Sequence, residues 1–215
     1  MSLGHCPHER RTGTFRAGEF SFPAGYLKQL RMEGPTEVIR IYELDEFNYP
    51  KFRSKLIDLY LHAFTTGEYA QYIAPETVEV TLDGVLRDGS GCMAFVGDWL
   101  VGLLASLPLR RDPDFPVEEC PGIPVGQTVY IAEVMVHADY RGRGIASRMM
   151  ECLLRKVSED YSYAVIRVWE KNRPAVELYK KLGFVPIAGI SQKKLNADGE
   201  EFEMKKVYLG KKVKN

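Results

Sequence analysis

One segment, residues 130–150, constrains this chain more than any other part of its sequence. It reads YIAEVMVHADYRGRGIASRMM, so an apolar run typical of a strand leads into a basic, glycine-spaced turn and then into an amphipathic helix. Gly142 and Gly144 let the backbone turn tightly and bring several N–H groups close to an anion. The helix start adds unpaired N–H donors and a positive dipole end. The segment therefore predicts a pyrophosphate site, flanked by the charges of Arg141 and Arg143.

Two well-known phosphate-binding loops do not fit this turn. A P-loop needs a lysine that reaches the outer phosphates, and no lysine stands near Gly142 or Gly144. A dinucleotide-binding loop follows its strand directly and has a third glycine. Here residues 137–141 intervene, and Ser147 occupies the third position. ATP and NAD are therefore weak candidates for the phosphate-bearing ligand.

Two motifs give the turn a more specific interpretation. Residues 141–146, RGRGIA, resemble the [QR]-x-x-G-x-[GA] signature of the GNAT superfamily of N-acetyltransferases, which bind acetyl-coenzyme A. Residues 168–184, VWEKNRPAVELYKKLGF, resemble the second motif of that family, N-x-x-A-x-x-[LF]-Y-x-x-x-G-F. Ala138 stands where the family usually has proline in the lead-in to the turn. The two motifs occur in the family's order and spacing, which is far more specific than either motif alone.

The resemblance implies a GNAT-type acyltransferase that uses acetyl-CoA. The turn and the helix start would hold the pyrophosphate, and the main chain of residues 134–136 would pair with the pantetheine arm where two strands of the sheet part. Asn172 would contact the cofactor from the second motif. The implied cofactor-binding residues are Val134, Met135, Val136, Arg141, Gly142, Arg143, Gly144, Ile145, Ala146 and Asn172.

Acetyl transfer to an amine also needs a base for the amine and a proton for the departing thiolate. Tyr179 matches the tyrosine that protonates the thiolate in many family members. Glu133 is the candidate base, because a carboxylate between apolar neighbours is not explained by packing. Strand alternation could instead turn Glu133 to the opposite face, and a water chain or His137 could serve as the base. Asn172 could be only a helix N-cap, and Tyr179 only a core aromatic.

The sequence indicates the residues of the acceptor pocket less clearly. Phe64, Tyr69 and Tyr72 fall in the interruption after the first predicted helix, where the family often forms a wall of its acceptor pocket. Residues 110–114 contain two arginines and two aspartates that could line another wall. Such mixed charges suit a small-molecule amine, an amino acid or a peptide end. Two alternatives also stay open: a non-catalytic acyl-CoA-binding or regulatory module, and a transferase for longer acyl donors.

The remaining patterns predict an α/β (α+β) fold, a single mixed, mostly antiparallel sheet of about 6–7 strands flanked by helices. An irregular extension (residues 1–35) would precede one domain (36–210) and a basic tail (211–215). The long loop at 110–127 contains four prolines. Predicted strands span residues 37–44, 92–96, 99–107, 130–136, 164–168, 184–190 and 201–209, and predicted helices begin at residues 48–50, 75, 145 and 173.

Composition narrows the partners and the compartment. The 29 basic and 29 acidic residues balance, so no overall charge attracts nucleic acid or a membrane. The four cysteines are scattered, and the lone His5-Cys6-Pro7-His8 cluster offers too few ligands, so we expect neither disulfides nor a metal site. No apolar run is long enough to span a bilayer. We expect a cytoplasmic protein, monomeric or homodimeric, whose partner is a small-molecule or peptide amine.

Overall fold

The computed structural model describes residues 38–66, 70–196 and 199–213. The predicted extension at residues 1–35 and the candidate acceptor residue Tyr69 lie outside these ranges. Within them, no helix has the length and apolar character needed to cross a membrane.

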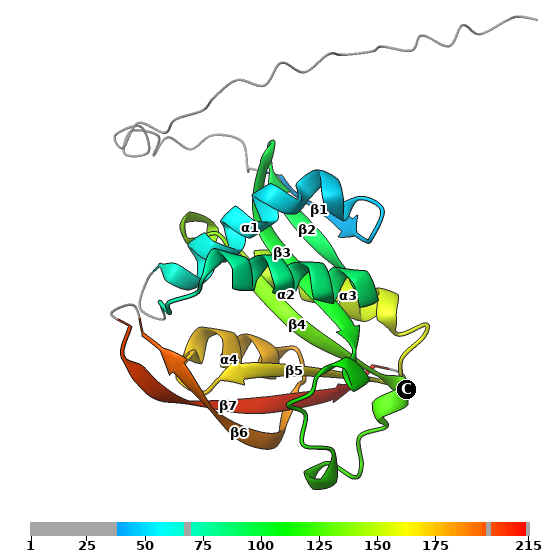
Figure 1. Cartoon of the computed structure of the whole chain (residues 1–215). Helices are drawn as coiled ribbons and strands as arrows, with labels where there is room; N and C mark the ends of the chain where they lie inside the picture. Colours follow the sequence, from blue (N-terminus) through cyan, green and yellow to red (C-terminus); the bar gives the residue numbers. More distant parts are fainter. Residues whose placement is uncertain (1–37, 67–69, 197–198, 214–215) are drawn as a thin grey trace, which may run out of the picture. The chain divides into compact units, whose positions relative to one another are not determined.

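Within the described residues, seven strands form one mixed sheet in the order β1-β2-β3-β4-β5-β7-β6 (Figure 1). Only β4 and β5 pair in parallel; the other neighbours are antiparallel, which confirms the predicted fold class. The strands are β1 (Ile39–Leu44), β2 (Ser90–Val96), β3 (Trp99–Pro108), β4 (Thr128–Val136), β5 (Tyr163–Trp169), β6 (Val185–Leu195) and β7 (Glu201–Lys212).

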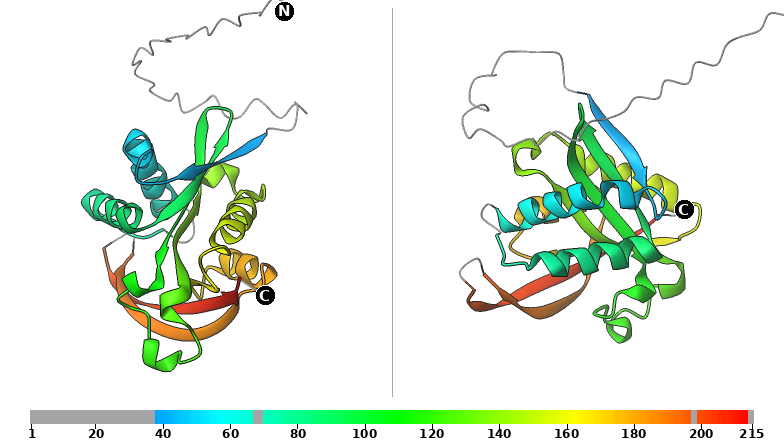
Figure 2. Two further views of the ribbon diagram at one scale, coloured as in Figure 1. Left: turned by 90° about the vertical axis from the view of Figure 1, so that its right-hand side faces the viewer. Right: turned by 45° about the horizontal axis from the view of Figure 1, so that its top comes forward.

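Four α-helices cover the two faces of this sheet among the described residues (Figure 2). On one face lie α1 (Tyr49–Thr65) and α2 (Pro75–Asp88), and on the other α3 (Ile145–Val157) and α4 (Arg173–Lys181). Proline at the first turn starts α1, α2 and α4, since its missing N–H costs nothing there. Each helix then buries the apolar stripe that its sequence carries.

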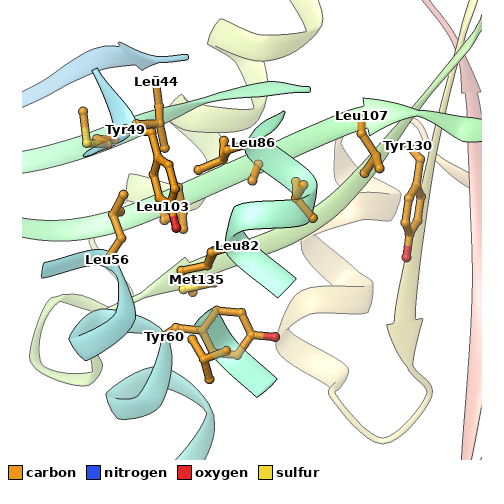
Figure 3. Packing of buried hydrophobic residues seen from close by; sticks show 14 of the residues in the cluster. Leu44, Tyr49, Leu56, Tyr60, Leu82, Leu86, Leu103, Leu107, Tyr130 and Met135 are labelled. Carbon is orange, nitrogen blue, oxygen red and sulfur yellow. The ribbon is translucent and has the colours of Figure 1, made fainter. Parts of the chain in front are cut away.

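The core under α1 and α2 explains how the first helix is held against the sheet. Figure 3 shows Leu56 and Tyr60 of α1 and Leu82 of α2 beside Leu103 and Met135 of the sheet. Leu56, Leu82 and Leu103 are fully buried. Truncating one such leucine to alanine costs about 2–5 kcal/mol, so this packing fixes the position of Tyr60.

Two irregularities of β4 prepare the functional site. The pairing of β4 with β5 ends at Ile131 and Ile166, although both strands continue, so a gap separates their carboxyl ends. In the pairing with β3, Ala105 lies opposite Glu133 and Ser106 opposite Ile131. Ala132 is therefore an extra residue, a β-bulge, which shifts the alternation of side chains along β4.

The bulge changes which face the following side chains occupy. Ile131 packs into the core on the α3 side of the sheet, whereas Met135, four residues later, packs into the core on the α1 side. Simple alternation would put both on the same face. Glu133 consequently points toward α1.

The chain end departs from the expected tail. β7 runs to Lys212, so residues 211 and 212 belong to the sheet, and Lys211 Nζ donates a hydrogen bond to the Leu182 carbonyl. β6 likewise continues to Leu195, five residues beyond the predicted end. The expected long loop is present, but it includes three short 3-10 turns, Leu109–Arg111, Val117–Glu119 and Val125–Gln127. A proline precedes each turn, namely Pro108 at the end of β3 and Pro116 and Pro124 within the loop, and prolines limit regular structure here.

Candidate active site

A cavity of about 1020 Å³ opens beside the gap between β4 and β5. Residues from both strands, from the starts of α3 and α4, from the end of α1 and from β6 and β7 line it. The predicted cofactor residues that line it are Val134, Met135, Val136, Arg141, Gly142, Gly144, Ile145, Ala146 and Asn172. Arg143 alone of that set does not.

The glycine turn has the geometry that an anion site needs. Gly142 and Gly144 have φ angles of 77° and 75°, in the left-handed region that favours glycine. A Cβ built on either would meet no atom within 4 Å, so the space in front of the turn is open. Gly144 precedes α3 and has no side chain to cap the first-turn N–H groups. These donors and the open space fit a pyrophosphate group.

The two arginines of the turn are held by the protein. Arg141 donates from Nη2 to the Ala63 carbonyl at 3.0 Å and from Nε to the Val136 carbonyl at 3.2 Å. It thereby links the end of β4 to the end of α1. Arg143 lies over the ring of Tyr140, with 4.8 Å from Cζ to the ring centroid. Both charges are therefore held in place, and of the two arginines only Arg141 borders the cavity.

Asn172 combines its two predicted roles. Its Oδ1 accepts a hydrogen bond from the Ala175 amide at 3.3 Å, which makes it the N-cap of α4. It also lines the cavity across the gap from α3.

Tyr179 reaches the cavity from α4. Its ring packs edge-on against Phe184, and only 5% of the residue is exposed. Its hydroxyl makes no hydrogen bond with the described residues, although Tyr179 lines the cavity. Burial, and to a smaller extent the nearby charge of Glu133, raise the pKa of the Tyr179 hydroxyl, so it keeps its proton at neutral pH.

Glu133 faces the same cavity from β4. Its Oε1 accepts a hydrogen bond from the Tyr60 hydroxyl at 3.1 Å. Burial raises the pKa of Glu133 to about 7, against the opposing effects of the Tyr60 hydrogen bond and of Lys206, Arg167 and Lys194. A carboxylate with a pKa near neutrality can both accept and release a proton at physiological pH.

His137, the alternative base, lies elsewhere. Its ring stacks on His62 of α1, with 3.9 Å between centroids, and does not line the cavity. Burial and the neighbouring His62 lower the pKa of His137.

The acceptor side of the cavity only partly follows the sequence-based prediction. Phe64 and Tyr72 line it, whereas Tyr69 lies outside the described residues. The Tyr72 amide donates to the Leu195 carbonyl at 3.3 Å, so the segment between α1 and α2 touches the end of β6. Of the mixed-charge loop, Asp114 lines the cavity, but Arg111 pairs with Asp88 at 3.0 Å outside it. Assigning the arginines of that loop to the pocket was therefore wrong.

The residues of this side that sequence reasoning overlooked include Tyr60, Arg167, Lys194 and Lys206. Arg167 carried a usable signal, because it is a charge inside the segment interpreted as an apolar central strand. The two lysines alternate with exposed residues along β6 and β7 and look like ordinary surface charges. Tyr60 looked like one more member of an apolar helix stripe.

Possible metal ligands and thiols were sought in the described ranges as well. There, no three His, Cys, Asp or Glu side chains are grouped to hold a metal ion. The described cysteines, Cys92, Cys120 and Cys152, are free thiols.

Comparisons with known proteins agree on one family. The model of the acetyltransferase (GNAT) family matches residues 40–184. A curated N-alpha-acetyltransferase of Saccharolobus solfataricus is 33% identical over 76 residues, which are 34% of this chain and 43% of that protein. The match thus spans less than half the length of that relative.

Solved structures share the fold. The structure of yncA from Salmonella typhimurium with its cofactor acetyl-CoA superposes with a TM-score of 0.60 at 14% identity, covering 83% of this chain and 95% of that one. The ribosomal-protein-S18-alanine N-acetyltransferase of Escherichia coli gives a TM-score of 0.58 at 13% identity, covering 83% and 96%.

Proposed function

Because the chain belongs to the GNAT acetyltransferase family, we propose that it transfers an acetyl group from acetyl-CoA to a primary amine of a small molecule or peptide. The observation that carries the proposal is the continuous cavity. It begins at the glycine turn before α3, passes the gap between β4 and β5, and reaches Glu133 and Tyr179. A held thioester and an attacking amine could therefore meet in one ternary complex.

The residues of the turn fit the phosphate end of the cofactor. The first-turn N–H groups of α3, beginning at Ile145, would bind the diphosphate, with Gly142 and Gly144 leaving the space clear. Residues 134–136 of β4 have no partner on β5 among the described residues, so their main chain is available to the pantetheine arm. Acetyl-CoA, when bound, supplies the acetyl group as an activated thioester.

Two side chains would then move the protons. An alkylamine has a pKa near about 10 and arrives mostly protonated. Glu133, with its pKa near 7, would accept a proton from the amine directly or through water. Tyr179, held protonated by burial, would donate its proton to the leaving sulfur. The nitrogen–carbon bond forms as the carbon–sulfur bond breaks.

Thiol release tests the proposal. The protein, acetyl-CoA and a broad panel of primary amines should release CoA thiol above the background rate, while CoA binding is followed separately by calorimetry. Bound CoA without turnover on any amine would favour a non-catalytic acyl-CoA-binding module. Faster transfer from longer acyl-CoA donors would redefine the donor.

We also propose that the protein is cytoplasmic and monomeric or homodimeric. We expect it to have no nucleic-acid or membrane partner.

A further inference from the structure

Two lysines at the acceptor end of the cavity have no partner among the described residues. Lys194 of β6 and Lys206 of β7 are both half-buried and line the cavity. Neither forms a hydrogen bond or an ion pair with any residue in the described ranges. A half-buried ammonium group without a counter-ion is unfavourable, and the charge of Lys194 also acts against the protonated form of Lys206.

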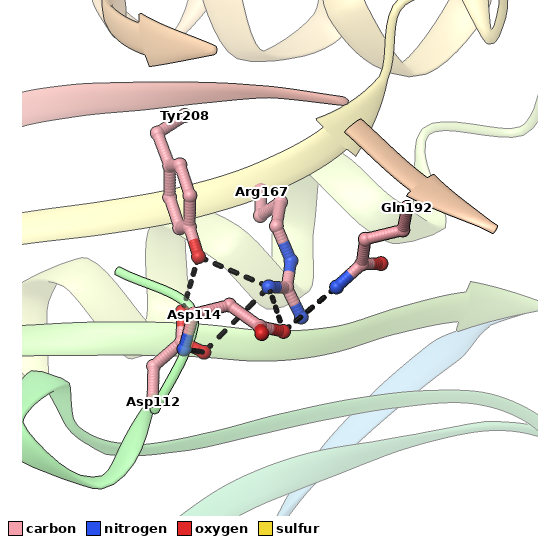
Figure 4. A network of polar contacts seen from close by, with 5 residues as sticks. All are labelled: Asp112, Asp114, Arg167, Gln192 and Tyr208. Carbon is pink, nitrogen blue, oxygen red and sulfur yellow. Dashed lines mark hydrogen bonds and ion pairs between the residues drawn. The ribbon is translucent and has the colours of Figure 1, made fainter. Parts of the chain in front are cut away.

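The third cation of this region, Arg167 of β5, is in a different situation. Its Nη1 donates to Asp114 Oδ2 at 2.7 Å and to the Tyr208 hydroxyl at 3.0 Å, and lies 3.6 Å from Asp112 Oδ1 (Figure 4). Gln192 Nε2 also donates to Asp114 Oδ2, at 2.7 Å. This network fastens the long loop to the sheet and leaves Arg167 with its charge fully compensated.

Neither lysine is bonded to a carboxylate that lines the cavity. In the described part of the chain, only Asp114 and Glu133 contribute carboxylates to the cavity lining. Asp114 accepts hydrogen bonds from Arg167 and Gln192, and Glu133 accepts one from Tyr60, so both carboxylates already have other partners. Both ammonium groups therefore remain available to donate hydrogen bonds to an anionic group of a bound acceptor.

The electrostatic environment of Lys206 also disfavours its protonated form. The pKa of Lys206 is lowered to about 8 by burial first and then by the charges of Arg167 and Lys194, and the nearby charges of Glu133 and Asp114 offset this only in part. A negative charge bound beside Lys206 would oppose the repulsion from Arg167 and Lys194 and favour its protonated form.

Resting on the proposed function, we propose that Lys194 and Lys206 bind a carboxylate of the acceptor, so that the preferred substrate carries a carboxylate close to its reactive amine. The amine would lie toward Glu133 and the carboxylate toward β6 and β7. Two sources of that carboxylate fit the chemistry: the α-carboxylate of a free amino acid, and the acidic side chain of an N-terminal Asp or Glu of a peptide.

Matched acceptor pairs test the inference and separate the two sources. The first pair compares free amino acids with their carboxamides, and the second compares peptide amides that begin with Glu or Gln. In at least one pair the carboxylate member should have a kcat/KM about tenfold or more higher, mainly through KM, as expected for a charge-assisted contact. Lys194→Gln and Lys206→Gln should each reduce that ratio about tenfold and leave CoA affinity unchanged.

The same strands provide controls. Lys193 and Lys205 are exposed neighbours on β6 and β7, so Lys193→Gln and Lys205→Gln remove the same charge from the opposite side of each strand. These two variants should keep the parent ratio, and their melting temperatures show whether the four proteins are folded.

The possible failures are distinguishable. Equal kcat/KM for both members of both pairs, or a preference that survives in Lys194→Gln and Lys206→Gln, would overturn this inference and leave acetyl transfer intact. CoA binding without acetylation of any amine would overturn the proposed function itself.

Discussion

The two halves of the cavity differ in how the chain assembles them. The cofactor half comes mainly from one continuous segment, residues 133–147, completed by the start of α4. The acceptor half collects Tyr60 of α1, Asp114 of the long loop and Lys206 of β7, which are far apart in the sequence. The first half is thus built by local backbone geometry, which a short motif can specify. The second depends on long-range packing, which no short motif specifies.

Tyr179→Phe should have the largest effect, because it removes a proton donor at the junction of the two halves. We expect kcat to fall about 100-fold or more, with CoA affinity within about twofold of the parent value. Steady-state kinetics and calorimetry measure the two quantities. Tyr161→Phe is the control, since Tyr161 packs against the core on the α3 side of the sheet and does not line the cavity. Unchanged kcat would reduce Tyr179 to a packing residue.

Glu133→Gln should be next, with a loss of about 100-fold in kcat/KM. The deprotonated carboxylate is the active form, so kcat/KM of the parent should rise with pH through about 7 and then level off. The rise should be absent in the variant. A parent profile that does not change between pH 6 and 8 would argue against Glu133 as the base.

Tyr60→Phe sharpens that assignment. The Tyr60 hydroxyl stabilises the carboxylate of Glu133 and so lowers its pKa. Without it, the rise in kcat/KM should move to higher pH.

Stability should show the same titration with a definite sign. The folded pKa of Glu133 lies above its ordinary value of 4.5, so its contribution to stability is largest below pH 4.5 and is lost as pH rises through about 7. Glu133→Gln should therefore melt at a higher temperature than the parent at pH 8, and this advantage should shrink toward pH 5. An advantage independent of pH would contradict the assigned pKa.

Gly144→Ala tests the local half alone. We expect CoA affinity to fall about tenfold, because a Cβ enters the space in front of the turn, and stability to fall by about 1 kcal/mol from the positive φ. Gly97→Ala is the matched control: Gly97 has φ 58° and equally open surroundings but lies in the turn between β2 and β3. It should lose similar stability and no CoA affinity. Equal CoA affinity in both variants would remove the turn from the cofactor site.

Arg141→Gln should give the smallest effect. It removes two hydrogen bonds that join the end of β4 to α1, with a cost of about 1 kcal/mol or a few degrees in Tm. We also expect CoA affinity to fall about threefold and to become less sensitive to salt than in the parent. Titrations at two salt concentrations measure this. If CoA affinity fell equally at both salt concentrations, Arg141 would have no electrostatic role in CoA binding. If Tm were unchanged, it would not stabilise the junction of β4 and α1.

Much of the fold and part of the site could be predicted because they depend on local rules. Apolar periodicity located α1 and α3, and proline with an N-cap located the start of α4. Strand β5, between α3 and α4, was also predicted, but the role of Arg167 within it was overlooked. The carboxylates that compensate its positive charge, Asp112 and Asp114, come from a loop that is distant in the sequence. Arg110 and Arg111 do not line the cavity, and Arg111 pairs instead with Asp88 of α2, which no local pattern indicates.

What the sequence by itself determined is the glycine turn, its helix and the order of the two motifs, because the positive φ angles and the uncapped helix start are properties of neighbouring residues. Only the tertiary structure decided where Glu133 points. The bulge at Ala132 arises from the pairing of β4 with β3, and one extra residue moves that carboxylate from the α3 face to the α1 face. The pairing of β6 with β7 likewise brings Lys194 and Lys206 to the cavity. The register between strands decides which face of the sheet each side chain occupies.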